Sequence, residues 1–128
     1  RSVGLLADQH AGMKGIDVPF FGKPASTTTG PAALAISFGR PIMLVACVRK
    51  PGGGAYEVLL SEPIVPATEA ESLVEIERLT TLMNVEIEKF VRKCPDQYLW
   101  LHDRWKLTKL WGRSAEFLAE KEKEEKND

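Results

Sequence analysis

The hydrophobic positions in the N-terminal half of the chain fall into continuous runs, which predict buried strands and a buried helix. Val3 to Ala7 is a short apolar run that predicts an inner strand, with Asp8 at its carboxyl end. Gly30-Pro31 opens a helix that is apolar nearly all round and ends at Gly39. The run 41–48 has no polar alternation and predicts a strand covered on both faces. The order strand, helix, strand favours an α/β fold.

The segment between the first strand and this helix, Gln9 to Thr29, contains three glycines and two prolines. So many turn residues predict an irregular loop rather than one long regular element. The loop carries an apolar island, Val18 to Phe21. Long loops in compact domains are often functional, so this segment is a candidate for binding.

Amphipathic spacing replaces the continuous runs in the second half of the chain. Pro51 to Gly54 predicts a turn, and Tyr56 to Ser61 predicts the returning strand of a hairpin. Thr68 and Glu71 have the spacing of a capping box. They predict the start of a long helix with one apolar stripe, which Pro95 ends.

The segment Pro95–Lys106 is rich in aromatic residues, and residues 107–128 form a mostly charged tail. Two tryptophans interleaved with Arg104 and Lys106 are compatible with a surface that faces anionic lipid. The alternative is a lid that packs its aromatic side chains on the core while Arg104 pairs with a carboxylate. Helical spacing of the aromatic residues favours the lid.

Composition narrows the class of protein. The chain has 128 residues, 44% of them hydrophobic, and a formal net charge of -1, which gives no reason to expect nucleic acid as a partner. Cys47 lies in an apolar run and is expected to be a buried thiol. His10 and His102 are too far apart in sequence to suggest a zinc site. No apolar run is long enough to span a bilayer, and the apolar strand at the very start suggests part of a longer protein.

Polar residues at element ends are the first candidates for a site. Asp8 and Gln9 follow a predicted strand, where ligands of open α/β sheets collect, although Asp8 could equally cap the following loop. Lys23 and the hydroxyls of residues 26–29 precede a helix N-terminus, a favourable place for a phosphate, although an ordinary N-cap explains them as well. Arg49 ends the next strand and is a further candidate.

Several motifs occur in a characteristic order and at workable spacing. They are Gly4-Leu5-Leu6-Ala7-Asp8-Gln9, Val18-Pro19-Phe20-Phe21-Gly22-Lys23-Pro24-Ala25 with Thr27, Gly30-Pro31-Ala32 with Leu34-Ala35, Pro41-Ile42 leading to Arg49, Asn84 with Ile87-Glu88, Pro95, Gln97, and Trp100-Leu101-His102-Asp103-Arg104-Trp105-Lys106. Together they resemble the bacterial lipid A biosynthesis acyltransferases, the lauroyl and myristoyl transferases. Tyr98 departs from the family, which more often has Trp there.

This resemblance implies an α/β fold in which residues 1–106 form the C-terminal part of a lysophospholipid-acyltransferase-like sheet flanked by helices. It implies transfer of an acyl chain from an acyl carrier protein, or from coenzyme A, to a hydroxyl of a lipid A precursor. The family's base is a histidine in a His-x-x-x-x-Asp/Glu motif, and neither His10 nor His102 fits that spacing. The catalytic histidine is therefore expected upstream of Arg1, and this chain alone is expected to be inactive.

The resemblance also implies site residues, without cofactor or metal. Asp8 is assigned to the catalytic region with its role left open. The expected substrate-binding residues are Gln9, Phe20, Phe21, Lys23, Thr27, Thr28, Thr29 and Arg49. Asp8 and the segment 27–29 are expected to face one crevice, because parallel strands would end on one edge.

The intact protein is expected at the cytoplasmic face of the inner membrane, with that membrane surface as a partner, and this chain alone is expected to be soluble. The alternative function is a non-catalytic α/β module that binds an anionic lipid or a phosphorylated ligand.

Overall fold

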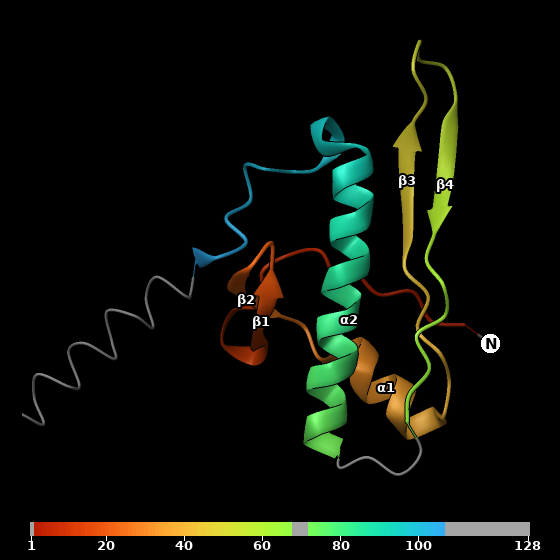
Figure 1. Ribbon diagram of the computed structural model, residues 1–128. Helices are drawn as coiled ribbons and strands as arrows, with labels where there is room; N and C mark the ends of the chain where they lie inside the picture. The colour runs from red at the N-terminus through yellow and green to blue at the C-terminus, as the bar shows by residue number, and fades with distance from the viewer. Residues whose placement is uncertain (1, 68–71, 107–128) are drawn as a thin grey trace, which may run out of the picture.

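The computed structural model describes residues 2–67 and 72–106. A long central helix, α2, has one small antiparallel hairpin on each side of it (Figure 1). In chain order the elements are η1 (Gly12–Lys14), β1 (Ile16–Phe20), β2 (Lys23–Thr27), α1 (Gly30–Phe38), β3 (Val45–Arg49), β4 (Tyr56–Leu60), α2 (Ser72–Lys93) and η2 (Pro95–Gln97). The fold is mixed α/β, as expected. The expectation of adjacent parallel strands is wrong, because both described sheets are two-stranded and antiparallel.

The first hairpin occupies the segment that was expected to be an irregular loop. Strands β1 and β2 pair from Ile16↔Thr27 to Phe20↔Lys23. Phe21 and Gly22 form the turn with φ values of 49° and 75°, the pair of positive φ angles that a two-residue type I′ turn requires. The glycines and prolines of this segment predicted an irregular loop, but Gly22 instead forms part of the hairpin turn. The prolines face each other in the ladder of a two-stranded ribbon, where their missing N–H groups cost little.

The N-terminal apolar run was expected to be an inner strand, and this is wrong. Residues 2–7 have no strand pairing, and Val3 and Leu6 are 74% and 87% exposed. Only Ala7 enters the core. An inner strand needs partners on both edges, and no described strand pairs with this run.

Helix α2 carries the amphipathic stripe that the sequence predicts, and this stripe serves two hydrophobic clusters. Leu79 and Met83 pack against α1 and Ile64, whereas Ile87 and Val91 pack against β1 and β2. Burial of each large apolar side chain contributes roughly 1.5–3 kcal/mol to the free energy of unfolding. Because both clusters include side chains of α2, this helix connects the two parts of the core. The predicted capping box at Thr68 and Glu71 lies outside the described residues.

Helix α1 and strand β3 are less covered than their sequences suggest. In α1, Ala35 is buried but Phe38 is 70% exposed, because the helix packs on α2 along one side. Its predicted end is confirmed, since Gly39 adopts a left-handed φ of 57°. Strand β3 was expected to be covered on both faces, yet Val45 is 62% exposed and Cys47 is exposed rather than buried. Only one face of the β3–β4 hairpin turns inward, and among the described residues nothing covers the other.

A buried carboxylate fixes the connection between β4 and α2. Glu75 is 2% exposed, and its carboxylate accepts hydrogen bonds from the Ala67 N–H at 2.7 Å and from the Arg78 guanidinium at 2.7 and 2.8 Å. The hydrogen bonds from Arg78 and Ala67 lower the pKa of Glu75 from 4.5 to about 2. The pairing with Glu75 also raises the pKa of Arg78.

Acid should therefore destabilise the protein partly through Glu75. A depressed folded-state pKa gives a contribution that is complete above the unfolded value of 4.5 and is lost as the pH falls towards about 2. We expect Glu75→Gln to flatten the dependence of the free energy of unfolding on pH over this window, measured by urea denaturation. Glu77→Gln, at an exposed position two residues away, is the control. An unchanged acid profile in Glu75→Gln would contradict the assignment.

Candidate functional site

The C-terminal segment, Pro95–Lys106, folds back over the residues around Asp8. The Tyr98 hydroxyl donates a hydrogen bond to the Asp8 carbonyl oxygen at 3.2 Å. The His10 N–H donates to His102 Nε2 at 2.9 Å, across 92 positions of sequence. The two histidines that looked unrelated in sequence are thus neighbours, and they join the two ends of the described chain.

Arg104 is the largest buried side chain of this region, with 1% of its surface exposed. Its guanidinium donates to the Ser26 carbonyl oxygen and, at 2.9 Å, to Thr27 Oγ1. A longer contact of 3.5 Å reaches Asn84 Oδ1 on α2. The lid interpretation is correct for the burial of Arg104. The recorded hydrogen bonds of this side chain go to uncharged oxygen atoms rather than to the carboxylate that was expected.

Thr27 is at the centre of this network and is itself fully buried. Its hydroxyl donates to the Ala25 carbonyl oxygen at 2.9 Å and accepts from Arg104 and from Asn84 Nδ2, the latter at 3.1 Å. Asn84 Nδ2 also donates to the Pro19 carbonyl oxygen at 3.0 Å. A hydroxyl has one donor and two acceptor positions, so all three of Thr27 are used inside the protein.

Electrostatics connects Asp8 to this network. Burial lowers the pKa of Arg104, and the nearby Tyr98 and Asp8 act in the opposite direction. Burial also raises the pKa of Tyr98, with Arg104 lowering it and Asp8 raising it. Asp8 is therefore within electrostatic reach of Arg104, which in turn contacts Thr27. Asp8 and Thr27 therefore both interact with Arg104, Asp8 through its charge and Thr27 through a hydrogen bond.

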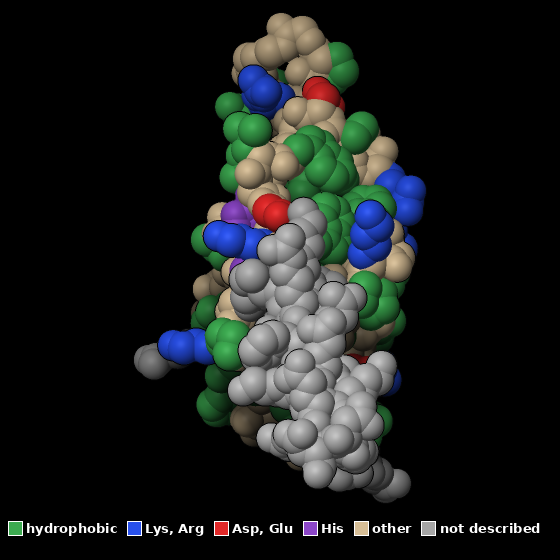
Figure 2. Space-filling view, turned by 90° about the vertical axis from the view of Figure 1, so that its left-hand side faces the viewer, with side chains coloured by type: hydrophobic (Ala, Val, Ile, Leu, Met, Phe, Trp, Pro, Cys, Tyr) green, Lys and Arg blue, Asp and Glu red, His purple; other side chains and the backbone are tan. Residues whose placement is uncertain are grey.

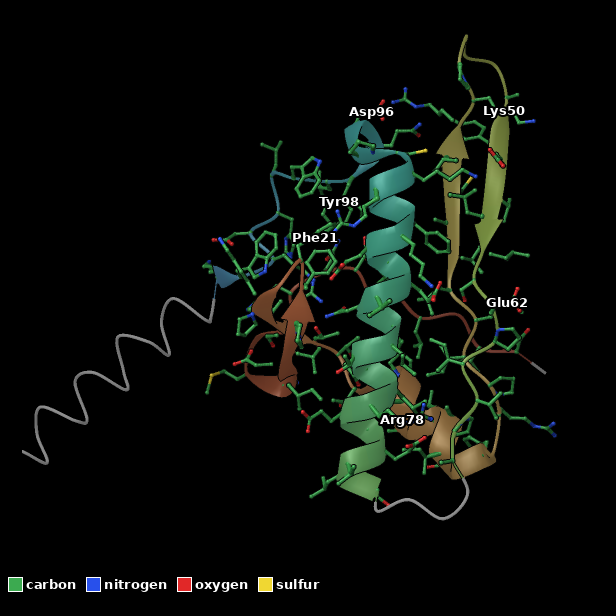
Figure 3. The ribbon with its side chains drawn as sticks, in the orientation of Figure 1. Phe21, Lys50, Glu62, Arg78, Asp96 and Tyr98 are labelled. Carbon is green, nitrogen blue, oxygen red and sulfur yellow. The ribbon has the colours of Figure 1, made fainter. Side chains whose placement is uncertain are left out.

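The remaining candidate residues differ in accessibility. Asp8 and Gln9 form an exposed bend. Phe20 is fully buried among Tyr98, Trp105 and Phe21, with ring centroids 4.8–6.1 Å apart, so its ring is part of the core. Phe21 is only half-buried, and it lies near Tyr98 on one side of α2 (Figure 3).

The polar candidate residues lie at three separate places. Lys23 is exposed beside the β1–β2 turn, and Thr28 and Thr29 are half-buried before α1. Thr28 Oγ1 accepts the Gly30 N–H at a long 3.4 Å, which leaves most of its capacity free. Arg49 ends β3, and its backbone is fixed by Gln97, whose amide accepts from Arg49 N at 2.7 Å and donates to Arg49 O at 3.0 Å.

Arg49 borders an open hollow of about 420 Å³, whose wall also includes Tyr56, Asp96 and Tyr98. Tyr98 is therefore common to this hollow and to the contact with Asp8. Sequence reasoning left Tyr98 out of the predicted site as a neutral replacement for tryptophan. Tyr98 makes its hydrogen bond to the Asp8 carbonyl oxygen through the phenol hydroxyl, a group that tryptophan lacks.

The comparison with known sequences agrees with this grouping of motifs. The model of the bacterial lipid A biosynthesis acyltransferase family matches residues 1–107. The chain belongs to this family. It is 34% identical over 90 residues to the lipid A biosynthesis lauroyltransferase of Escherichia coli K12, which is 70% of this chain and 28% of that protein. It is 33% identical over 120 residues to the palmitoleoyltransferase of the same organism, which is 92% of this chain and 37% of that protein.

The chain thus spans about a third of the length of the curated relatives it matches. Within residues 2–67 and 72–106, no group of three metal-ligating side chains occurs. No helix of the described part is both long and apolar enough to cross a membrane.

Proposed function

We propose that residues 1–106 form the C-terminal part of an enzyme that moves a fatty acyl chain from an acyl carrier protein to a hydroxyl group of a lipid A precursor. Coenzyme A is the alternative donor, and the site of action is the cytoplasmic face of the inner membrane. The family match over residues 1–107 carries this proposal. The contact of the C-terminal segment with Asp8 and His10 supports it, because motifs from both ends of the chain meet there.

The reaction needs a base, and neither histidine of this chain suits that role. In acyl transfer the acceptor oxygen attacks the thioester carbonyl, the carbon–sulfur bond breaks, and the hydroxyl proton passes to the base. His102 Nε2 already accepts a hydrogen bond from the His10 N–H. The buried His10 Nδ1 has no partner among the described residues and faces no solvent. We propose that the base is instead a histidine outside this chain, in the His-x-x-x-x-Asp/Glu motif that the family resemblance implies.

The chain's own contribution is to bind and orient substrate. The exposed Lys23 ammonium at the start of β2 supplies a point charge for a phosphate of the acceptor. Thr28 and Thr29 follow the other end of β2, before α1, and offer separate polar contacts to the substrate. Half-buried Phe21 offers an apolar ring to an acyl chain. Asp8, whose backbone is held by Tyr98, presents an exposed carboxylate that can orient a cationic or proton-transferring group.

A chimera tests the proposal directly. Residues 1–107 replace the matched segment of the Escherichia coli palmitoleoyltransferase, and acyl transfer from acyl carrier protein thioester to a lipid A precursor is measured. We expect product well above background from the chimera and none from the 128-residue chain alone. Turnover by the chain alone would place the base within it. An inactive but folded chimera, with anionic lipid bound by the chain, would favour the non-catalytic binding module.

Two variants of the active chimera should separate binding from turnover. Lys23→Ala should raise KM for the phosphorylated acceptor about tenfold, since one charge-assisted contact of roughly 1.5 kcal/mol is lost. Asp8→Asn should instead lower kcat at least tenfold, because an orienting carboxylate acts on the reacting groups. Lys14→Ala, at another exposed lysine, is the control. Equal effects of Lys14→Ala and Lys23→Ala on KM would contradict the phosphate role of Lys23.

A further inference from the structure

The C-terminal segment exposes three consecutive apolar side chains. Leu99 is 58% exposed, Trp100 is 51% exposed and Leu101 is 96% exposed. Single exposed apolar residues are ordinary on protein surfaces, whereas a contiguous group marks an interaction site. We call these three residues the Leu99–Leu101 turn.

The Leu99–Leu101 turn is held in place rather than loose. The Trp100 N–H donates to the Tyr98 carbonyl oxygen at 2.9 Å, and the His102 N–H donates to the Leu99 carbonyl oxygen at 3.2 Å. The Trp100 ring lies 4.9 Å from Tyr98 and donates its Nε1–H to the Pro95 carbonyl oxygen at 2.6 Å. Because that polar atom is already satisfied, the ring can enter an apolar environment without leaving an unpaired donor.

The Phe21 ring connects the turn to the Arg92 guanidinium. The Trp100 ring lies 6.3 Å from Phe21, and the Arg92 guanidinium lies 4.8 Å from the centre of the same Phe21 ring. Arg92 is 67% exposed and only loosely paired with Glu88, at 3.8 Å. Lys23 and Lys106 are also exposed, two positions after Phe21 and one position after Trp105. Figure 2 shows hydrophobic side chains gathered on the upper part of this face, with Lys and Arg on both sides of them.

Acidic side chains in the same segment weaken the attraction of this surface to anionic headgroups. Asp96 and Asp103 are exposed in the same segment. The apolar side chains of the turn therefore have to supply most of the binding free energy, with the basic residues adding preference for anionic headgroups.

We propose that the Leu99–Leu101 turn is a membrane contact that enters the interface of a bilayer containing anionic phospholipid. Tryptophan prefers the boundary between water and lipid, where its ring is half wet, and lysine and arginine meet the headgroup phosphates. A projecting turn fits the bilayer interface better than it fits a protein groove, which receives an extended strand or a helix face. This inference rests on the turn and its basic neighbours and does not depend on acyl transfer.

Co-flotation of the purified 128-residue chain with vesicles tests the proposal. The vesicles are pure phosphatidylcholine, or a 3:1 mixture of phosphatidylcholine and phosphatidylglycerol. We expect binding that is stronger to the mixed vesicles, and we expect Leu99→Ser with Leu101→Ser to weaken it at least tenfold, because two large apolar side chains no longer enter the bilayer. Leu101→Ser alone should weaken binding severalfold, at a position too exposed to affect folding.

The matched control is Val58→Ser with Leu60→Ser on the uncovered face of β4, where the side chains are 61% and 60% exposed. This pair should leave vesicle binding unchanged. Arg92→Gln should weaken binding severalfold to the mixed vesicles only. The proposal is overturned if the unmodified chain does not float with either vesicle, if the two double variants weaken binding equally, or if binding survives in the Leu99 and Leu101 variants.

Discussion

Replacing Arg104 by leucine should lower the free energy of unfolding by about 2–3 kcal/mol. The substitution removes the donors that reach Ser26, Thr27 and Asn84, and it leaves their buried oxygen atoms short of partners. Relief of the buried charge offsets part of this cost, since burial already lowers the pKa of Arg104. Urea denaturation followed by circular dichroism measures the loss.

Two further variants define the cause of that loss. Arg104→Lys keeps the charge but cannot reach three acceptors at once, so its free energy of unfolding should fall between that of the unmodified chain and that of Arg104→Leu. Lys106→Leu, at an exposed basic position two residues on, should change stability by less than about 0.5 kcal/mol. A fully stable Arg104→Leu would mean that this network does not hold the C-terminal segment in place.

Phe20→Ala should be still more destabilising, by about 3–5 kcal/mol. The Phe20 ring is completely buried, with Trp105 at 5.6 Å and the Arg104 guanidinium at 5.3 Å from its centre. Its loss opens a cavity between the β1–β2 hairpin and the C-terminal segment, so the segment should detach before the rest of the chain unfolds. Amide hydrogen exchange at His10, whose N–H bonds to His102, reports that detachment.

The control for Phe20→Ala is Phe38→Ala on α1, where the ring is 70% exposed. This variant should cost less than about 0.5 kcal/mol and should leave the exchange rate of the His10 amide unchanged. If Phe20→Ala and Phe38→Ala destabilise equally, the second hydrophobic cluster is not the link between the two ends of the described chain.

Local pattern was sufficient for several elements. The apolar stripe of α2, the glycine that ends α1 and the hairpin of β3 and β4 follow from spacing and turn residues that act over a few positions. The ordered motifs were sufficient to identify the family, because residue types and their order can be compared directly from the sequence. These conclusions do not require knowledge of which segments meet in space.

The first hairpin shows where local pattern was misleading. Prolines and glycines between Gln9 and Thr29 suggested a loop, since each usually interrupts a strand. In a ribbon of two strands the outer edges carry no further ladder, so Pro19 and Pro24 can face each other there. Whether a strand has neighbours on one edge or on both is a property of the sheet, and a short stretch of sequence does not contain it.

The sequence by itself determined helices α1 and α2, the second hairpin and the family of this chain. Three features were decided by the tertiary structure alone. The His10 N–H bonds to His102, and the Thr27 hydroxyl accepts hydrogen bonds from Arg104 and Asn84. The Leu99–Leu101 turn stays exposed. The physical reason is distance along the chain. Periodicity reports on neighbours within one or two turns of an element, whereas these contacts join residues up to 92 positions apart and depend on how both hairpins pack around α2.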